Sequence, residues 1–165
     1  GVPALPPFPW VYLYQEDGPR LGSVVLRPIV PITLVAVDVA PTSLALVDSG
    51  CEHVLAAPWL ANSVGIDLDQ SHREIDLGVG GETVKVRFAD VTLRLQAPDV
   101  ADDDVYIEWQ GEVGFPHHWR PTWPILVGQV GFLDQFTVTM SRLAQQVVVE
   151  APESFDERFG IRSGS

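Results

Sequence analysis

The segment ETVKVRFADVTLRL, residues 82 to 95, constrains the fold more than any other part of the chain. Val84, Val86 and Phe88 alternate with a lysine and an arginine. This alternation puts the apolar side chains on one face of an extended strand and the charged ones on the other. An amphipathic helix would instead need apolar residues three or four positions apart. We therefore predict a β-strand with one buried face.

The alternation continues past Phe88 with its parity reversed. Val91, Leu93 and Leu95 are now the apolar positions. Because side chains in a strand repeat every two residues, a shift of one residue moves the apolar set to the opposite face. The sequence therefore predicts a bulge or a bend at Ala89-Asp90. Before this strand, Gly78, Gly80 and Gly81 predict a hairpin tip that needs unusual backbone angles.

Short apolar runs and scattered turn residues fill most of the remaining chain. The 14 glycines and 14 prolines favour a turn-rich β protein over a helical bundle. Further strands are expected within 21–39, at 44–47, 73–79, 105–109 and 124–127, and in a terminal hairpin made of FTVTM and QQVVVE. One short helix is expected at 58–64 and one helical turn in GFLDQF. This pattern predicts an all-β barrel or sandwich.

The chain of 165 residues has the length of one domain, with extensions at both ends. Residues 1–20 are rich in proline, which favours an extended arm or linker over a packed element. Residues 21–150 carry the predicted strands. Residues 151–165 are expected to be a polar tail.

Charge and composition argue against several classes of partner. The formal net charge of −12 repels the phosphates of nucleic acids and the surface of an anionic membrane. No apolar run reaches the roughly 18 residues of a membrane span. Cys51 is the one cysteine, so neither an intramolecular disulfide nor a cysteine cluster can form. We therefore expect no metal, no cofactor, no nucleic acid and no membrane contact in this segment.

The stretch LALVDSGCEHVL, residues 44 to 55, carries the strongest functional signal. An apolar strand runs into Asp48, and an acid at the mouth of a buried strand costs free energy unless it is paired or used. Asp48 and Ser49 can form an Asx-type turn with a purely structural role. Alternatively, the Asp48 carboxylate takes part in a catalysed reaction.

Other chemistries find less support in the sequence. Ser49 with His53 lacks the Gly-x-Ser-x-Gly elbow of a serine hydrolase. Cys51 and His53 are two apart on an extended strand, which does not align them for proton transfer. The adjacent His117 and His118 lack the spacing of a helical metal pair. These histidines and the tryptophans near them could line a pocket, but such clusters more often pack in the hydrophobic core or at its edge.

Three features occur in order along the chain: LALVDSG, then the glycine-rich IDLGVGGETVKVRFADVTLRL, then PILVGQVGFLDQF. In this order and spacing, residues 21–150 resemble the retropepsin-like aspartic proteases, the retroviral type and its bacterial relatives. The stretches RPIVPITL and GFLDQFTV are similar to the bacterial branch in particular. The resemblance implies a closed retropepsin-like acid-protease barrel with one or two short helices.

The resemblance also assigns roles by position. Asp48 would be the catalytic aspartate, supported in its loop by Ser49 and Gly50. A flap that closes over bound peptide would have its tip at Gly78, Val79, Gly80 and Gly81. Substrate-binding positions would be Cys51, Glu52, Ile125, Leu126 and Val127, and Gly128 would end the element that supports the catalytic loop. The apolar members, with Val79, predict a preference for apolar side chains flanking the cut.

Aspartic proteolysis needs two carboxylates that share one proton. One chain supplies one such aspartate, so an active enzyme would be a homodimer with a polypeptide substrate. Relatives often carry an arginine where this chain has Gln129, and that arginine pairs with an acid at the position of Glu52. Gln129 can offer only a neutral hydrogen bond there. A catalytically silent dimerisation or peptide-binding module is therefore the alternative, and an unrelated β-barrel ligand binder is a third.

Overall fold

The computed structural model describes residues 8–20, 23–79, 81–100 and 104–160. Its strands are β1 (Trp10–Leu13), β2 (Gln15–Arg20), β3 (Ser23–Arg27), β4 (Ile29–Val35), β5 (Ser43–Val47), β6 (Val54–Ala56), β7 (Glu74–Val79), β8 (Glu82–Gln96), β9 (Tyr106–Pro116), β10 (Ile125–Val127), β11 (Thr137–Ser141) and β12 (Gln146–Glu150). Its helical elements are α1 (Pro58–Ser63), η1 (Leu68–Gln70), η2 (Gln129–Leu133) and α2 (Pro152–Phe159).

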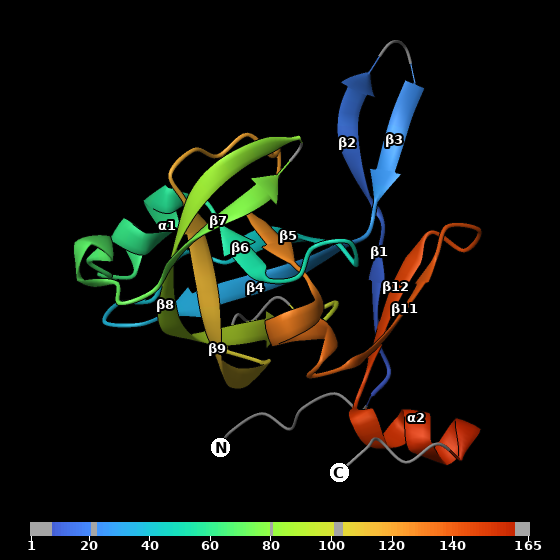
Figure 1. The fold of residues 1–165 in the computed structure, drawn as a ribbon. Helices are drawn as coiled ribbons and strands as arrows, with labels where there is room; N and C mark the ends of the chain where they lie inside the picture. The colour runs from blue at the N-terminus through green and yellow to red at the C-terminus, as the bar shows by residue number, and fades with distance from the viewer. Residues whose placement is uncertain (1–7, 21–22, 80, 101–103, 161–165) are drawn as a thin grey trace.

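Six strands form a closed barrel (Figure 1). Their order is β4, β5, β10, β6, β9 and β8, and β8 pairs with β4 to close the ring. Strand β7 extends the sheet beyond β8 as the outer strand of a hairpin. The closed all-β barrel expected from the sequence is confirmed, and among the expected elements so are the short helix at 58–63 and the terminal hairpin β11–β12.

Of the bulge or bend predicted at Ala89-Asp90, the bulge is absent from the pairing of β8 with β9. Strand β8 is continuous over 15 residues, and its register with β9 runs without a shift from Val86↔Pro116 to Gln96↔Tyr106. The parity reverses because the two halves of the strand bury opposite faces. Phe88 belongs to a small cluster beneath the flap, whereas Val91 and the apolar residues after it belong to the main core.

The apolar interior is divided into two parts. The main core fills the barrel and includes Phe115, Ile125, Val127 and Phe132, each 0% exposed. A satellite cluster consists of Leu55, Val86, Phe88 and Leu126. Three further residues pack on this second cluster: Cys51 from the Asp48 loop, Val79 from the β7–β8 hairpin and Trp119 from the loop after β9. The satellite cluster thus links the elements to which the sequence assigns function.

Residues 10–13 pair with a strand near the other end of the chain, which differs from the extended arm that the prolines of residues 1–20 favour. Strand β1 pairs antiparallel with β12, with Trp10 opposite Val149. Trp10 is 1% exposed, and the Tyr12 hydroxyl donates to the Gln96 carbonyl at 2.6 Å. The sequence did not predict strand β1, because the prolines within residues 3–9 favour an extended arm. The two buried aromatic residues come only just after these prolines.

Strands β2 and β3 form a two-stranded hairpin that projects beyond the barrel (Figure 1). At the other end of the chain, the expected polar tail contains α2, which begins at Pro152 and is capped by Gly160 at φ +62°. The sequence analysis did not predict α2, although proline in the first turn and glycine after the last are typical of a helix. Among the helices described, none is both long enough and apolar enough to cross a membrane.

Candidate active site

Asp48 follows β5 directly and forms an Asx-type turn. Its backbone N–H donates to the Val127 carbonyl at 2.9 Å, which fixes the start of the loop to β10. The Gly50 N–H donates to Oδ1 of Asp48 at 3.1 Å, and the Cys51 N–H donates to the Asp48 carbonyl at 3.1 Å. Asp48 is half-buried, whereas Ser49 and Gly50 are exposed. The turn therefore presents the carboxylate at the surface on a rigid support.

Strand β10 lies between the two strands that flank the Asp48 loop. It is parallel to β5, with Val127 opposite Val47, and antiparallel to β6, with Leu126 opposite Leu55. Gly128 follows immediately, and a Cβ atom there would lie 2.1 Å from the Cys51 carbonyl oxygen. The absence of a side chain at Gly128 is what lets the two loops touch.

The two loops are joined by backbone hydrogen bonds beyond Gly128. The Gln129 N–H donates to the Cys51 carbonyl at 2.9 Å, and the Val130 N–H donates to the Glu52 carbonyl at 2.8 Å. The Gln129 side chain donates from Nε2 to the Ser49 carbonyl at 2.6 Å. It therefore holds the Asp48-Ser49-Gly50 backbone instead of pairing with the Glu52 carboxylate.

Cys51 sits in this loop as a packing residue. Its Sγ donates to the His53 carbonyl at 3.2 Å. Burial raises the pKa of the Cys51 thiol; the hydrogen bond to His53 lowers it, and the nearby charges of Asp48 and Glu52 raise it further. The thiol therefore stays protonated at neutral pH, which disfavours a cysteine nucleophile. The His53 ring instead meets the Phe88 ring edge-on at 5.1 Å.

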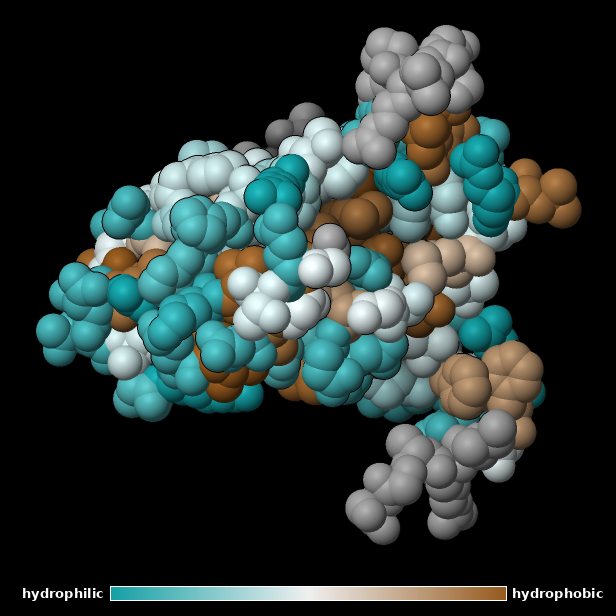
Figure 2. Space-filling view, turned by 45° about the horizontal axis from the view of Figure 1, so that its top comes forward, coloured by the Kyte–Doolittle hydropathy of each residue, from teal (hydrophilic) through white to brown (hydrophobic). Residues whose placement is uncertain are grey.

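An open cavity of about 400 Å³ lies beside Asp48. Leu46, Val47 and Trp123 line it together with Asp17 and Arg27 at the base of the β2–β3 hairpin. Arg27 Nε lies 3.5 Å from Asp17 Oδ2. Figure 2 shows hydrophobic surface where this hairpin meets the barrel. Sequence reasoning missed Asp17 and Arg27, because only the fold brings the hairpin to the end of β5.

The segment expected to form the flap is the β7–β8 hairpin, which is paired from Glu74↔Arg87 to Val79↔Glu82. Gly81 has φ +83°, the left-handed conformation predicted for the tip. Gly78 instead lies in strand β7 and has no positive φ, so unusual backbone angles are not needed there. Gly80 lies outside the described residues.

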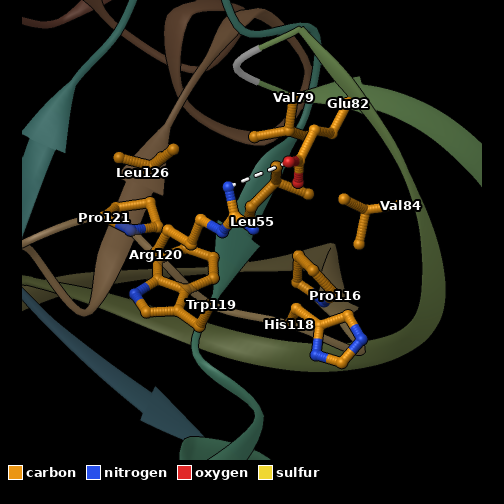
Figure 3. Close-up of a pocket in the computed structure, with 10 residues that line it drawn as sticks. All are labelled: Leu55, Val79, Glu82, Val84, Pro116, His118, Trp119, Arg120, Pro121 and Leu126. Carbon is orange, nitrogen blue, oxygen red and sulfur yellow. Dashed lines mark hydrogen bonds and ion pairs between the residues drawn. The ribbon is translucent and has the colours of Figure 1, made fainter.

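A second cavity, of about 260 Å³, lies beneath the flap (Figure 3). Its apolar lining is Leu55, Val79, Val84, Pro116, Trp119 and Leu126. Glu82, His118 and Arg120 add polar groups. Pro121 lines both this cavity and the one at Asp48, so the two are neighbours.

The predicted subsite residues divide between cavity and core. Val79 and Leu126 line the cavity. Ile125 and Val127 do not, because alternate residues of a strand face opposite sides and both are 0% exposed in the main core. Sequence reasoning gave no role to Leu55 or Arg120, and it left Trp119 among the aromatics expected in core and rim.

His117 and His118 do not form a metal site. His117 Nε2 lies 3.7 Å from Glu74, while His118 lines the flap cavity. Within the described ranges, no three or more His, Cys, Asp or Glu side chains are grouped so that they could hold a metal ion.

No protein-family model matches the sequence, and no curated protein matches it either. Among solved structures, the chain is similar to the crystal structure of a retropepsin-like aspartic protease from Rickettsia conorii. The match covers 84% of this chain and 95% of that one, with 17% sequence identity and a TM-score of 0.41.

Proposed function

We propose that this chain is an aspartic endopeptidase that acts on extended polypeptides as a homodimer. The observation that carries the proposal is the placement of Asp48. Its loop is fixed to β10 through Val127 and through the close approach at Gly128. The cavity beside it adjoins the apolar cavity under a glycine-tipped hairpin. A carboxylate held rigidly next to a covered groove suits hydrolysis of a bound chain.

In the proposed mechanism, Asp48 of each copy meets at the two-fold axis. Like charges at contact cannot both ionise easily, so the two carboxyl groups share one proton, as in aspartic proteases. The ionised Asp48 takes a proton from water, and the resulting hydroxide attacks the scissile carbonyl carbon. The protonated Asp48 gives its proton to the carbonyl oxygen. The tetrahedral intermediate then breaks its C–N bond. The Asp48 that received the proton from water donates it to the nitrogen, and the other Asp48 takes a proton from a hydroxyl of the intermediate as the new carboxyl group forms.

The substrate would lie as an extended strand between the Asp48 pair and the flap. Main-chain hydrogen bonds would supply affinity, and pockets for alternate side chains would supply selectivity. Val79 and Leu126 are the proposed apolar subsite walls. Ser49 and Gly50 support the catalytic turn. After them, Cys51 packs on the satellite cluster and Glu52 is exposed.

A silent dimerisation or peptide-binding module is the second candidate. Gln129 favours it, because this side chain binds the Ser49 carbonyl and forms no charged pair with Glu52. In the endopeptidase, the same contact would instead hold the catalytic turn in place. Cleavage separates the two candidates, since both would bind peptide.

The test is cleavage of a mixed peptide library from about pH 4 to pH 7 by the wild type, Asp48→Asn and Asp38→Asn. Asp38 is an exposed aspartate in the loop between β4 and β5 and serves as the matched control. We expect Asp48→Asn to lower kcat by about 1,000-fold or more and Asp38→Asn to leave it unchanged.

The outcomes separate the candidates. Peptide binding without cleavage, by a folded wild-type dimer, would establish the binding module. Equal cleavage by wild type and Asp48→Asn would mean that Asp48 has only a structural role in its turn. Full activity from a protein that sediments only as a monomer would exclude the shared dyad.

A further inference from the structure

The β2–β3 hairpin is a separate two-stranded ribbon. Among the strands described, β2 and β3 pair only with each other, from Gln15↔Arg27 to Arg20↔Ser23. Figure 1 shows the ribbon projecting beyond the barrel, on the side away from α1. A ribbon of two strands is at best marginally stable in water by itself. The hairpin is therefore stabilised when a further surface covers it.

Apolar side chains lie on both faces of this ribbon. Strand β3 contains three consecutive apolar residues, Val24, Val25 and Leu26. Val24 is 55% exposed, and the other two are half-buried. Because neighbours along a strand point to opposite faces, these residues place apolar groups on each side of the hairpin. A ribbon that faces only solvent would carry polar residues there. The apolar run therefore favours a protein surface as the covering partner.

The base of the hairpin is fixed next to the candidate catalytic strand. Arg142, in the turn between β11 and β12, has its Nη1 3.5 Å from the Leu26 carbonyl, to which it donates. Just beyond the hairpin, the Pro28 carbonyl accepts from the Val47 N–H at 2.9 Å. Asp48 is the next residue after Val47. The direction in which the ribbon projects is thus set by the strand that carries the Asp48 carboxylate.

The position of the hairpin places it near the axis of the proposed dimer. Asp17 and Arg27, at its base, line the open cavity beside Asp48. In the proposed mechanism the two Asp48 carboxylates meet at a two-fold axis, so the surface around one Asp48 faces the same surface of the partner. The ribbon starts at this surface and extends beyond the barrel. In the dimer it would therefore run alongside the partner.

The loops at Asp48 are too small to hold a dimer together by themselves. Their exposed residues are Ser49, Gly50, Glu52, Gln129 and Val130. A stable interface takes roughly 20–30 residues from each partner. Strands β2 and β3 add six and five residues next to these loops. Val130 is 48% exposed and offers apolar surface on which a hairpin can pack.

Resting on the dimeric peptidase proposed above, we propose that the β2–β3 hairpin of each copy packs on the partner, beside the partner's Asp48 loop. The surface that covers the apolar ribbon is a second copy of this chain. Apolar contact suits this interface, because two copies with a formal net charge of −12 repel each other. The hairpin closes the open side of the cavity at the partner's Asp48, so each site is complete only in the dimer.

The placement is tested by photo-crosslinking between copies. Protein labelled with heavy nitrogen carries Val24→p-benzoylphenylalanine, and it is mixed with unlabelled wild type until mixed dimers form. We expect crosslinks that join the labelled hairpin to unlabelled peptides containing Asp48 or Val130. Native mass spectrometry checks that mixed dimers are present. If they are, and the hairpin links only to labelled peptides, the proposed contact is wrong.

The apolar contact is tested by Val24→Thr, which keeps the branched shape and introduces a hydroxyl. Two-fold symmetry repeats the change at two equivalent contacts, so we expect the dimer dissociation constant to rise by about tenfold or more. Val37→Thr is the matched control, because Val37 is 81% exposed and lies against Gly65, at the end of α1. That variant should dimerise like the wild type. Sedimentation equilibrium measures all three proteins, and an unchanged constant for Val24→Thr would overturn the contact.

A shortened chain separates the hairpin from the folding of the barrel. Gln15 and Arg27 lie directly opposite each other, so an Asn-Gly turn can replace residues 16–26. We expect this variant to keep the circular dichroism of the barrel and to sediment as a monomer at concentrations where the wild type is dimeric. Dimerisation as tight as that of the wild type would overturn the proposal.

The inference and the proposed function fail in different ways. If the wild type is dimeric and cleaves peptides, but Val24→Thr and the shortened chain dimerise equally well, the hairpin contact is wrong and the peptidase stands. If dimerisation depends on the hairpin but the wild type cleaves nothing, the contact stands and the peptidase is wrong. A wild type that sediments only as a monomer would overturn the contact, whether or not it cleaves.

Discussion

Gly128 is the glycine at which the fold leaves the least room for a side chain. A Cβ atom there would lie 2.1 Å from one carbonyl oxygen, that of Cys51, and 2.5 Å from that of His53. Both obstacles are backbone atoms of the loop that carries Asp48. Relief would require the loop and β10 to separate, which would also break the hydrogen bond between Asp48 and Val127.

We therefore predict that Gly128→Ala destabilises the protein by about 3 kcal/mol or more. Urea unfolding monitored by circular dichroism measures the change. Gly78→Ala is the control, because a Cβ there meets nothing within 4 Å and the backbone has no positive φ. That control should fall within about 0.5 kcal/mol of the wild type. A Gly128→Ala protein of unchanged stability would show that the two loops do not depend on this contact.

Residues such as Asp48 and Gly128 can be predicted from the sequence, because their expected roles depend on neighbours close in the chain. Asp48 ends a strand, and Gly128 ends a short apolar run. Trp119 and Arg120 carry no such local pattern. They acquire roles because the closed barrel brings the loop after β9 beneath the β7–β8 hairpin. The register of strands that are distant in sequence cannot be read from composition or spacing.

Strand β1 shows how an element can be hidden by its surroundings. Its four residues alternate between buried and exposed, and the buried ones pack on the main core beside β12. Proline in the preceding residues favours an extended arm, and the short strand that follows adds too few residues to change that prediction. Pairing with a strand near the opposite end of the chain is what stabilises it.

We predict that Trp10→Ala lowers the free energy of unfolding by about 3–5 kcal/mol, because the side chain is 1% exposed and its removal leaves a cavity. Leu13→Ala on the same strand is the control and should cost less than about 0.5 kcal/mol, since Leu13 is 69% exposed. Thermal and urea unfolding of both variants measure these values. Equal, small effects would mean that β1 is dispensable for folding.

Two copies of this chain would each carry a formal net charge of −12. Their mutual repulsion opposes the homodimer that the proposed mechanism requires. Salt shortens the range of that repulsion, from about 10 Å at 0.1 M to about 3 Å at 1 M. The charge of the whole molecule therefore links dimer strength to ionic strength.

We predict that the dimer dissociation constant falls as salt rises from about 0.1 M to 1 M. Sedimentation equilibrium at several concentrations measures it, and the specific activity of dilute enzyme should rise in parallel. If ion pairs between the copies dominate the interface, the dissociation constant would rise instead. That result would contradict an association limited by net charge.

Strand β8 also limits which insertions the β7–β8 hairpin can tolerate. Its C-terminal half is fixed in the barrel seam opposite β4, and its N-terminal half forms one arm of the flap. Phe88 lies at the junction, where its carbonyl accepts from the Ser71 hydroxyl at 2.7 Å and its N–H donates to the Arg73 carbonyl at 3.0 Å. Inserting one codon before Phe88 would turn every flap side chain to the opposite face. Viable flap lengths in descendants of this gene should therefore differ by even numbers of residues in each arm.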